Sequence, residues 1–186
     1  MDLILINRNI RLRDNAALFY GSLNQNYRVI YPYDKAYWNS NGRSEVQFNF
    51  FLESLQELDV ELRKINSCVE IFDGGFTDLR KYIDENFQDS KIHVNHITET
   101  NYFRNKFNDF KRHFEKTQKI LTYNDFGIQT ESINRDKWAH DWNKLMKKNL
   151  LDFPKPNIKS LGKGLLSVSQ FKEIKGFSKQ KSHQSG

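Results

Sequence analysis

The sequence predicts an α/β fold: a doubly wound, Rossmann-like, five-stranded parallel sheet with helices on both faces. Short apolar runs alternate with longer segments in which apolar residues recur every three or four positions, as in repeated βαβ units. The runs are mostly apolar throughout, as expected for strands that are buried on both faces. With 186 residues, the chain is long enough for one such domain.

The expected strands are short, and each is a run of mostly apolar residues. Because helical segments separate them, right-handed crossovers should place the strands parallel in one sheet. The ligand crevice should then lie at the carboxyl ends of the strands, near the point where the strand order reverses. The expected strands cover residues 3–6, 28–31, 69–72, 92–94 and 120–123.

Five segments have the period of a helix. The pair Asp14-Asn15 should cap a short helix that runs to about residue 23, and Ser44 should begin a long amphipathic helix that runs to about residue 65. Thr77 should cap a third helix, after the Asp73-Gly74-Gly75 turn. The last two helices are expected over residues 98–114 and 136–151.

The basic charge of the chain is concentrated in its tail. Lys and Arg number 29 against 23 Asp and Glu, and the sequence pI of 9.3 alone would suggest nucleic-acid binding. However, residues 155–186 contain seven lysines and one acid, which leaves the preceding residues balanced. Pro154 and Pro156 mark the change. We therefore expect a domain over residues 1–153 and a basic linker or docking arm over residues 154–186.

Several classes of protein and site are not expected. The single cysteine, Cys68, excludes an intramolecular disulfide and suits a small buried residue in a reducing compartment. No apolar run is long enough for a signal peptide or a membrane span, so the expected location is cytoplasmic, with no membrane partner. The five histidines do not have the spacing of metal ligands, so no metal is expected. His93 and His96 are expected to be polar loop residues, and Trp138 and Trp142 to pack in a core.

The connection after the first expected strand has three arginines and no glycine. A dinucleotide site of the usual kind is therefore not expected, because side chains keep the backbone away from the phosphates. Arg8, Arg11 and Arg13 follow the carboxyl end of a strand, where they could hold an anion. Alternatively, they pair with neighbouring acids such as Asp14 and position the loop.

Several motifs resemble those of DNA photolyases and cryptochromes, in the same order along the chain. Residues 8–18 resemble the opening motif Arg-Asp-Leu-Arg-Leu-x-Asp-Asn-x-Ala-Leu, and residues 50–59 resemble the helix Phe-Leu-x-Glu-Ser-Leu-x-Asp-Leu-Asp. Residues 29–34 are similar to the second strand of that family, and residues 72–74 to the turn after its third strand. Asn95 and Glu99 match its Asn-x-x-x-Glu motif. The resemblance covers about residues 2–150.

The resemblance implies an antenna domain. In this family, the amino-terminal α/β domain binds an antenna chromophore (a folate, a deazaflavin or a flavin), while a larger helical domain holds FAD and the pyrimidine-dimer pocket. FAD is not expected in this chain, and the chain alone is not expected to repair DNA. The candidate chromophore-binding residues are Arg8, Asn9 and Arg11 in the first loop, with Glu99 and Asn101 in the fourth. The alternative role for each of them is ordinary loop capping.

Three positions depart from the family pattern. Asn9 stands where the family usually has Asp, Gln47 where it commonly has Arg, and Ile97 where it often has Asp. Gln47 and Ile97 remove polar groups that would meet a chromophore. Each unmade buried hydrogen bond costs about 1–3 kcal/mol, so weaker binding is expected.

Three functions follow as hypotheses. The first is the antenna domain of a photolyase or cryptochrome, whose partner is an FAD-bearing helical domain or chain, with DNA contacted only indirectly. The second is a chromophore-free binding or scaffold module that uses its basic tail on nucleic acid or an acidic protein. The third is an unrelated α/β protein that binds a nucleotide such as ATP or AMP.

Overall fold

One mostly parallel sheet forms the centre of the molecule. The computed structural model describes residues 1–39, 44–97, 100–124, 135–158 and 165–175. The strands are β1 (Asp2–Leu5), β2 (Tyr27–Tyr33), β3 (Val69–Asp73), β4 (Lys91–Asn95), β5 (Ile120–Tyr123) and β6 (Leu166–Ser167). Their order is β5-β4-β1-β2-β3-β6, so the strand order reverses between β1 and β4. Strands β1 to β5 are parallel, and β6 is antiparallel to β3.

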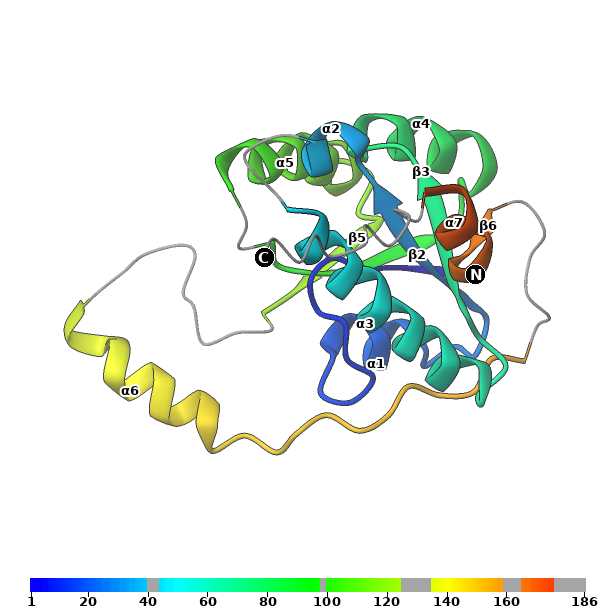
Figure 1. Cartoon of the computed structure of the whole chain (residues 1–186). Coiled ribbons are helices and arrows are strands. Elements are labelled where there is room, and N and C mark those ends of the chain that lie inside the picture. The colour runs from blue at the N-terminus through cyan, green and yellow to red at the C-terminus, as the bar shows by residue number, and fades with distance from the viewer. Residues whose placement is uncertain (40–43, 98–99, 125–134, 159–164, 176–186) are drawn as a thin grey trace, which may run out of the picture.

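Helices cover both faces of the sheet (Figure 1). They are α1 (Ala16–Gly21), α2 (Lys35–Asn39), α3 (Glu45–Arg63), α4 (Phe76–Asn86), α5 (Asn101–Glu115), α6 (Arg135–Met146) and α7 (Val168–Lys175). One apolar core contains residues of α1, α3 and α7, and the other contains residues of α2, α4 and α5. Neighbouring residues of β1 alternate between these cores, with Ile4 in the first and Leu3 and Leu5 in the second.

The predicted α/β class and all five predicted strands are confirmed, with ends that differ by at most two residues. The predicted strand number is wrong, because β6 makes a sixth strand of only two residues. The capping roles of Asn15 and Ser44 are confirmed, since each side chain accepts a backbone N–H of its helix. The cap predicted at Thr77 is wrong, because Gly75 is the N-cap of α4.

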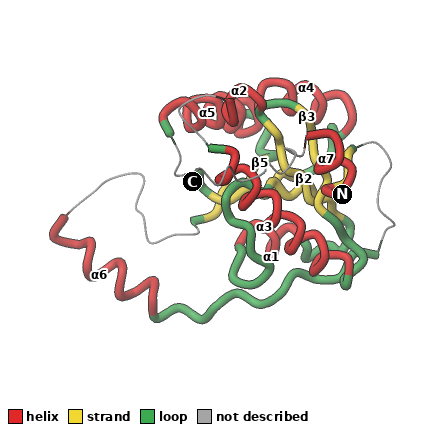
Figure 2. Tube along the Cα trace, viewed as in Figure 1, coloured by secondary structure: helices red, strands yellow, loops and turns green. Residues whose placement is uncertain are grey.

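Two further expectations are wrong and one is confirmed. His93 is not a loop residue: it lies within β4 and is 4% exposed. Trp138 and Trp142 are not in a core, since they are 50% and 38% exposed and stack on each other with centroids 5.8 Å apart. Their helix, α6, projects away from the sheet (Figure 2). Cys68 is buried, as expected.

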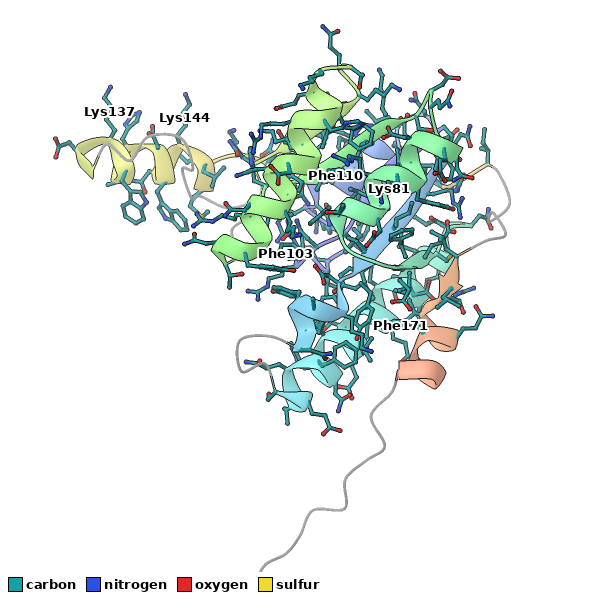
Figure 3. All side chains as sticks on the ribbon, turned by 90° about the horizontal axis from the view of Figure 1, so that it is seen from above. Lys81, Phe103, Phe110, Lys137, Lys144 and Phe171 are labelled. Carbon is teal, nitrogen blue, oxygen red and sulfur yellow. The ribbon has the colours of Figure 1, made fainter. Side chains whose placement is uncertain are left out.

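Parts of the tail pack on the domain. Asn157 donates from Nδ2 to the Tyr27 carbonyl (2.8 Å), and the Tyr27 hydroxyl donates to the Lys155 carbonyl (2.7 Å). The expectation that apolar residues of 161–171 lie against the body is confirmed for Val168 and Phe171, which are 1% and 0% exposed in the α3 core. Figure 3 shows Phe171 on α7. The domain boundary at residue 153 stays a prediction.

Within the described ranges, none of the helices has the length and apolar character needed to cross a lipid bilayer.

A buried ion pair joins β2 to β3. Arg28 and Glu70 have side chains that are 10% and 6% exposed, and the two groups meet through two contacts, one of them an Nε to Oε1 hydrogen bond of 2.8 Å. Removal of one partner leaves the other charge buried. We expect Arg28→Ala to lower the free energy of unfolding by about 3–5 kcal/mol in urea denaturation. The matched control is Arg112→Ala, which removes an exposed pair with Asp109 and should cost under about 1 kcal/mol. Equal losses of unfolding free energy in the two variants would contradict a stabilising role for the buried pair.

The packing of α7 makes a second prediction. Phe171 has its ring 4.7 Å from that of Tyr33 and 6.5 Å from that of Phe48, measured between centroids. Loss of a buried aromatic ring typically costs about 3–5 kcal/mol. We therefore expect Phe171→Ala to destabilise the whole domain by that amount in the same assay. Ile158→Ala is the control, because Ile158 is 69% exposed. An unchanged urea midpoint for Phe171→Ala would mean that α7 is not part of the folded unit.

Candidate functional site

A cavity of about 430 Å³ lies at the carboxyl ends of β1 and β2. We call it the Trp38 pocket. It falls within the range of about 300–1,000 Å³ that is usual for ligand pockets. Helices α2, α3 and α5 supply the rest of its walls. Its lining residues are Ile6, Asn7, Arg8, Ile10, Tyr31, Pro32, Tyr37, Trp38, Gln47, Phe50, Phe51, Ser54 and Phe103.

The short helix α2 is positioned by hydrogen bonds at both of its aromatic residues. The Asp34 carboxylate, just before the helix, accepts the backbone N–H of Tyr37 (3.1 Å). The indole N–H of Trp38 donates to the Tyr31 hydroxyl of β2 (3.0 Å). These bonds fix both rings of α2 at the end of the sheet.

Aromatic rings form the walls of the Trp38 pocket. Trp38 lies 5.0 Å from Phe51 of α3 and 5.6 Å from Tyr37, and Tyr37 lies 4.6 Å from Phe103 of α5, all between centroids. Phe50 of α3 lines the same cavity with 70% of its surface exposed. Such a surface suits a flat, partly apolar ligand, because aromatic rings contact each other by stacking and edge contacts.

Arg8 supplies a positive charge to this cavity. It is exposed, lies three residues after the end of β1, and donates from its guanidinium to the Tyr37 hydroxyl (3.1 Å). A guanidinium is always charged and can hold a carboxylate or phosphate with two hydrogen bonds. The pocket therefore combines apolar walls with a group that can bind an anion.

Three buried asparagines join the ends of β1 and β4 to the start of α1. Asn7 donates from Nδ2 to the Asn95 carbonyl (3.2 Å), and Asn95 donates from Nδ2 to Oδ1 of Asn15 (2.8 Å). In return, Asn95 accepts the backbone N–H of Ala17 (3.0 Å), and Asn15 donates to the Asn9 carbonyl (2.9 Å). We call these residues the asparagine network. It fills the point at which the strand order reverses.

The five sequence-predicted site residues do not gather at one place. Arg8 lines the Trp38 pocket, but Arg11 folds back and donates from Nε and Nη2 to the Asp14 carbonyl (2.9 and 2.7 Å). Asn9 is 3% exposed, and Asn101 is an exposed residue at the start of α5 that accepts from Arg104. Glu99 lies outside the described residues. Their role in chromophore binding stays a prediction.

The structure also places the departures from the family pattern. Gln47 lines the Trp38 pocket, but its side-chain oxygen accepts the backbone N–H of Ser44 (3.2 Å) in the capping box of α3. Ile97 is buried in the core beneath α5. One departure has therefore become part of a helix cap, and the other has become a core residue.

Most of the aromatic walls have no clear signal in the sequence. Tyr37 and Trp38 belong to a helix of only five residues, which is too short to give a periodic signal. Phe103 was expected only as a core residue. One available signal was the dense group of aromatic residues that follows the second strand.

A second cavity, of about 890 Å³, lies beside α1 and the end of β5. We call it the Tyr20 groove. It is formed by α1, the end of β5, the end of α6 and the segment that follows α6, and Tyr20, Tyr123 and Trp142 are among its lining residues. Within the described ranges, His, Cys, Asp and Glu side chains form no group that could hold a metal ion.

Comparison with known proteins identifies the family. The model of the DNA photolyase family matches residues 2–119 of this chain. No curated protein sequence matches it significantly.

Solved structures show the same fold. The archaeal photolyase from Sulfolobus tokodaii, whose structure is described as containing two FAD molecules and as implying a novel light-harvesting cofactor, is 22% identical with a TM-score of 0.71. A class III photolyase from Agrobacterium tumefaciens is 17% identical (TM-score 0.67), and the Synechocystis cryptochrome is 18% identical (TM-score 0.64). These likenesses cover 95%, 91% and 86% of this chain, but only 42%, 37% and 38% of the three others.

At these identities, the structural likeness establishes the fold, and the family match covers more than half of the chain. The chain therefore belongs to the DNA photolyase family, in which it corresponds to the amino-terminal α/β domain.

Proposed function

We propose that this chain binds a light-harvesting chromophore in the Trp38 pocket and acts as the antenna part of a photolyase or cryptochrome. The observation that carries the proposal is the aromatic cavity at the carboxyl ends of β1 and β2, with Arg8 in its lining. A folate, a deazaflavin and a flavin are all flat conjugated molecules. The Sulfolobus photolyase, with its two FAD molecules, supports a flavin among these three.

The residues present fit such a group. The volume of about 430 Å³ suits a conjugated ring system, and the rings of Trp38, Phe50 and Phe51 can contact its faces. Arg8 can pair with a phosphate or a glutamate carboxylate on a side chain of the ligand. Ser54 and Asn7 add polar groups to the lining.

The protein's own contribution is binding and orientation. The bound chromophore would supply absorption in the near ultraviolet or blue. The aromatic walls would exclude water from one part of the ligand, while the exposed Arg8 would hold its anionic part near solvent. The asparagine network fixes the loop that carries Arg8, so the orientation of the ligand is set relative to the sheet. Light-driven repair or light sensing would require the FAD-bearing domain of the family.

Phe50 gives the sharpest test, because it lines the pocket while 70% of its surface is exposed. We expect the purified chain to carry or take up a chromophore, and Phe50→Ala to weaken binding about threefold to tenfold, since an aromatic contact is worth about 0.5–1.5 kcal/mol. Titration of FMN, FAD, a deazaflavin and a reduced folate, followed by absorption and fluorescence, measures the affinity. Val46→Ala is the control, because Val46 is 76% exposed on the same helix and is not a lining residue.

A separate pair of variants tests the positive charge of Arg8. Arg8→Ala should weaken binding of an anionic chromophore about tenfold or more, while Arg13→Ala, in the same loop, should leave it unchanged. A colourless protein that binds none of the four compounds would contradict the proposal and would favour a chromophore-free module of the same fold.

We further propose that an FAD-bearing helical domain, in the same or another chain, contacts α6. Trp138, Trp142 and Met146 follow one another at intervals of four residues, so they share one side of the helix. They are 50%, 38% and 58% exposed. This chain covers only 42% of the Sulfolobus photolyase, so that relative contains a large additional part. Lys137 and Lys144 point from another side of α6 (Figure 3).

This contact is tested by separating the two sides of α6. With an FAD-bearing helical domain from a photolyase as the added partner, Trp138→Ala/Trp142→Ala should weaken association at least tenfold, because exposed tryptophans are typical anchors of interfaces. Lys137→Ala/Lys144→Ala is the matched control and should change affinity less than about threefold. Analytical ultracentrifugation and energy transfer to FAD measure the complex. Equal effects of the two double variants would contradict the role of the tryptophans.

A further inference from the structure

A pair formed by the half-buried Tyr123 and the buried His93 lies at the Tyr20 groove, away from the Trp38 pocket. The Tyr123 hydroxyl at the end of β5 is 2.8 Å from Nδ1 of His93 in β4. The two rings are nearly parallel, at 10°, with centroids 5.9 Å apart. This pairing of a phenol with an imidazole is not used by the proposed chromophore site.

The environment of His93 decides where the protons lie. On its other side, Nε2 is 3.5 Å from Oδ2 of Asp2, which also accepts a hydrogen bond from Asn24 (2.8 Å). Nε2 makes no hydrogen bond with a described residue, but it faces a carboxylate, which can only accept, so the imidazole proton is assigned to Nε2 and Nδ1 accepts the hydroxyl proton of Tyr123. Burial lowers the pKa of His93 and raises the pKa of Tyr123 to about 12. Both groups are therefore neutral near pH 7.

The Tyr123 ring also contacts an exposed aromatic residue. It stacks on Tyr20 of α1 with centroids 5.1 Å apart and ring planes at 15°, and 40% of Tyr20 is exposed. Gly21 allows α1 to lie close to β1 and β4, because a Cβ there would be 3.1 Å from Cγ of His93 and 2.5 Å from Cγ1 of Ile4. Both tyrosines line the Tyr20 groove, so an oxidant in this groove can contact the stacked pair.

We propose that Tyr123 is a one-electron donor and that His93 is its proton acceptor. One electron leaves the Tyr123 ring, with Tyr20 stacked on it, for a one-electron oxidant in the Tyr20 groove, of the class of photo-excited flavins or metal polypyridyls. The O–H bond of Tyr123 breaks, and its proton forms an N–H bond at Nδ1 of His93. The products are a neutral Tyr123 phenoxyl radical, a His93 imidazolium and the oxidant reduced by one electron.

The surroundings of His93 favour this step. A phenol becomes a strong acid when it loses an electron, so a base already within hydrogen-bond distance removes the cost of a free radical cation. The new imidazolium faces the Asp2 carboxylate in a buried site, where opposite charges attract more strongly than in water. The positive charge of Lys91 repels the new imidazolium, but Lys91 is exposed at the start of β4. His93 can therefore hold the proton while Tyr123 is oxidised and give it back when Tyr123 is reduced.

The test places a photo-oxidant next to Tyr123 in the full chain. Asn124 is exposed, so Asn124→Cys can carry a ruthenium polypyridyl label. Cys68 should remain unlabelled, because it is buried and its pKa is raised to about 12. Flash-quench oxidation should give the absorption and electron paramagnetic resonance signals of a neutral phenoxyl radical. The same label at Lys106→Cys, beside the exposed Tyr102, is the positional control and should give a shorter-lived radical.

Two variants decide the assignment. Tyr123→Phe should abolish the long-lived radical, whereas its persistence would overturn the proposal. His93→Gln keeps a hydrogen-bond acceptor but not a base, and it should slow oxidation about 100-fold, as expected when a positioned proton acceptor is lost. His113→Gln, at an exposed pair with Asp84, should have no effect.

A measurement without a substitution at His93 covers the case in which that variant fails to fold. Oxidation of Tyr123 in the labelled chain should be slower in D₂O than in H₂O, because the proton moves together with the electron. Equal rates in the two solvents, or equal rates in the chain with His93 and in folded His93→Gln, would overturn the role of His93. The photo-oxidant in this assay is the ruthenium label at position 124, and no antenna chromophore is added, so the outcome does not depend on ligand binding in the Trp38 pocket.

Discussion

The asparagine network is the constraint on which the carboxyl edge of the sheet depends. Each of its side chains can donate and accept at once, so three neutral residues can tie two strands and a helix together without burying a charge. The same bonds set the direction in which the chain leaves β1. Arg8 is directed to the Trp38 pocket, and α1 is held against β4, which brings Tyr20 to Tyr123. Both aromatic cavities therefore rely on one polar cluster, and in a low-dielectric interior each unmade bond of that cluster costs about 1–3 kcal/mol.

The sequence was sufficient for the parts of the fold that are governed by local periodicity. The five parallel strands are short apolar runs, and Ser44 and Asn15 are residues that favour helix caps, so these elements could be predicted. Strand β6 has two residues and α2 has five, which is too few for a period to be recognised. His93 was misplaced because histidine suggests a loop, whereas Asp2 and Tyr123, 91 and 30 positions away, supply the partners that allow its burial. Such partners become visible only when the strands are assembled.

The candidate site was predicted in part for a similar reason. Arg8 could be found because it lies in the loop just after a strand, where the carboxyl edge of the sheet must be. Arg11, three residues later, could not be separated from it by sequence. Its direction depends on Asp14, which has a φ of 55° and turns its carbonyl toward the guanidinium. The aromatic walls come from β2 and three helices, and no local pattern states which face of each helix meets the others. The tryptophans of α6 are the opposite case: a spacing of four residues places them on one side of the helix, but it does not tell whether that side is buried or exposed.

Asn9 shows how a departure from the family pattern can agree with the physics of this fold. Its side chain is 3% exposed, and neither polar atom of its amide has a hydrogen-bond partner among the described residues. The carboxylate usual in the family would bring a full charge into this place, and a buried unpaired charge costs far more than a buried amide. Asparagine keeps the shape of aspartate and removes that charge. The loop therefore retains its path beside Asn7 and Asn15, and Arg8 is left as the charged group of this loop that lines the Trp38 pocket. A site of this kind would recognise its ligand through one external cation and a neutral aromatic interior, which suits a flat chromophore with an anionic side chain better than a cationic ligand.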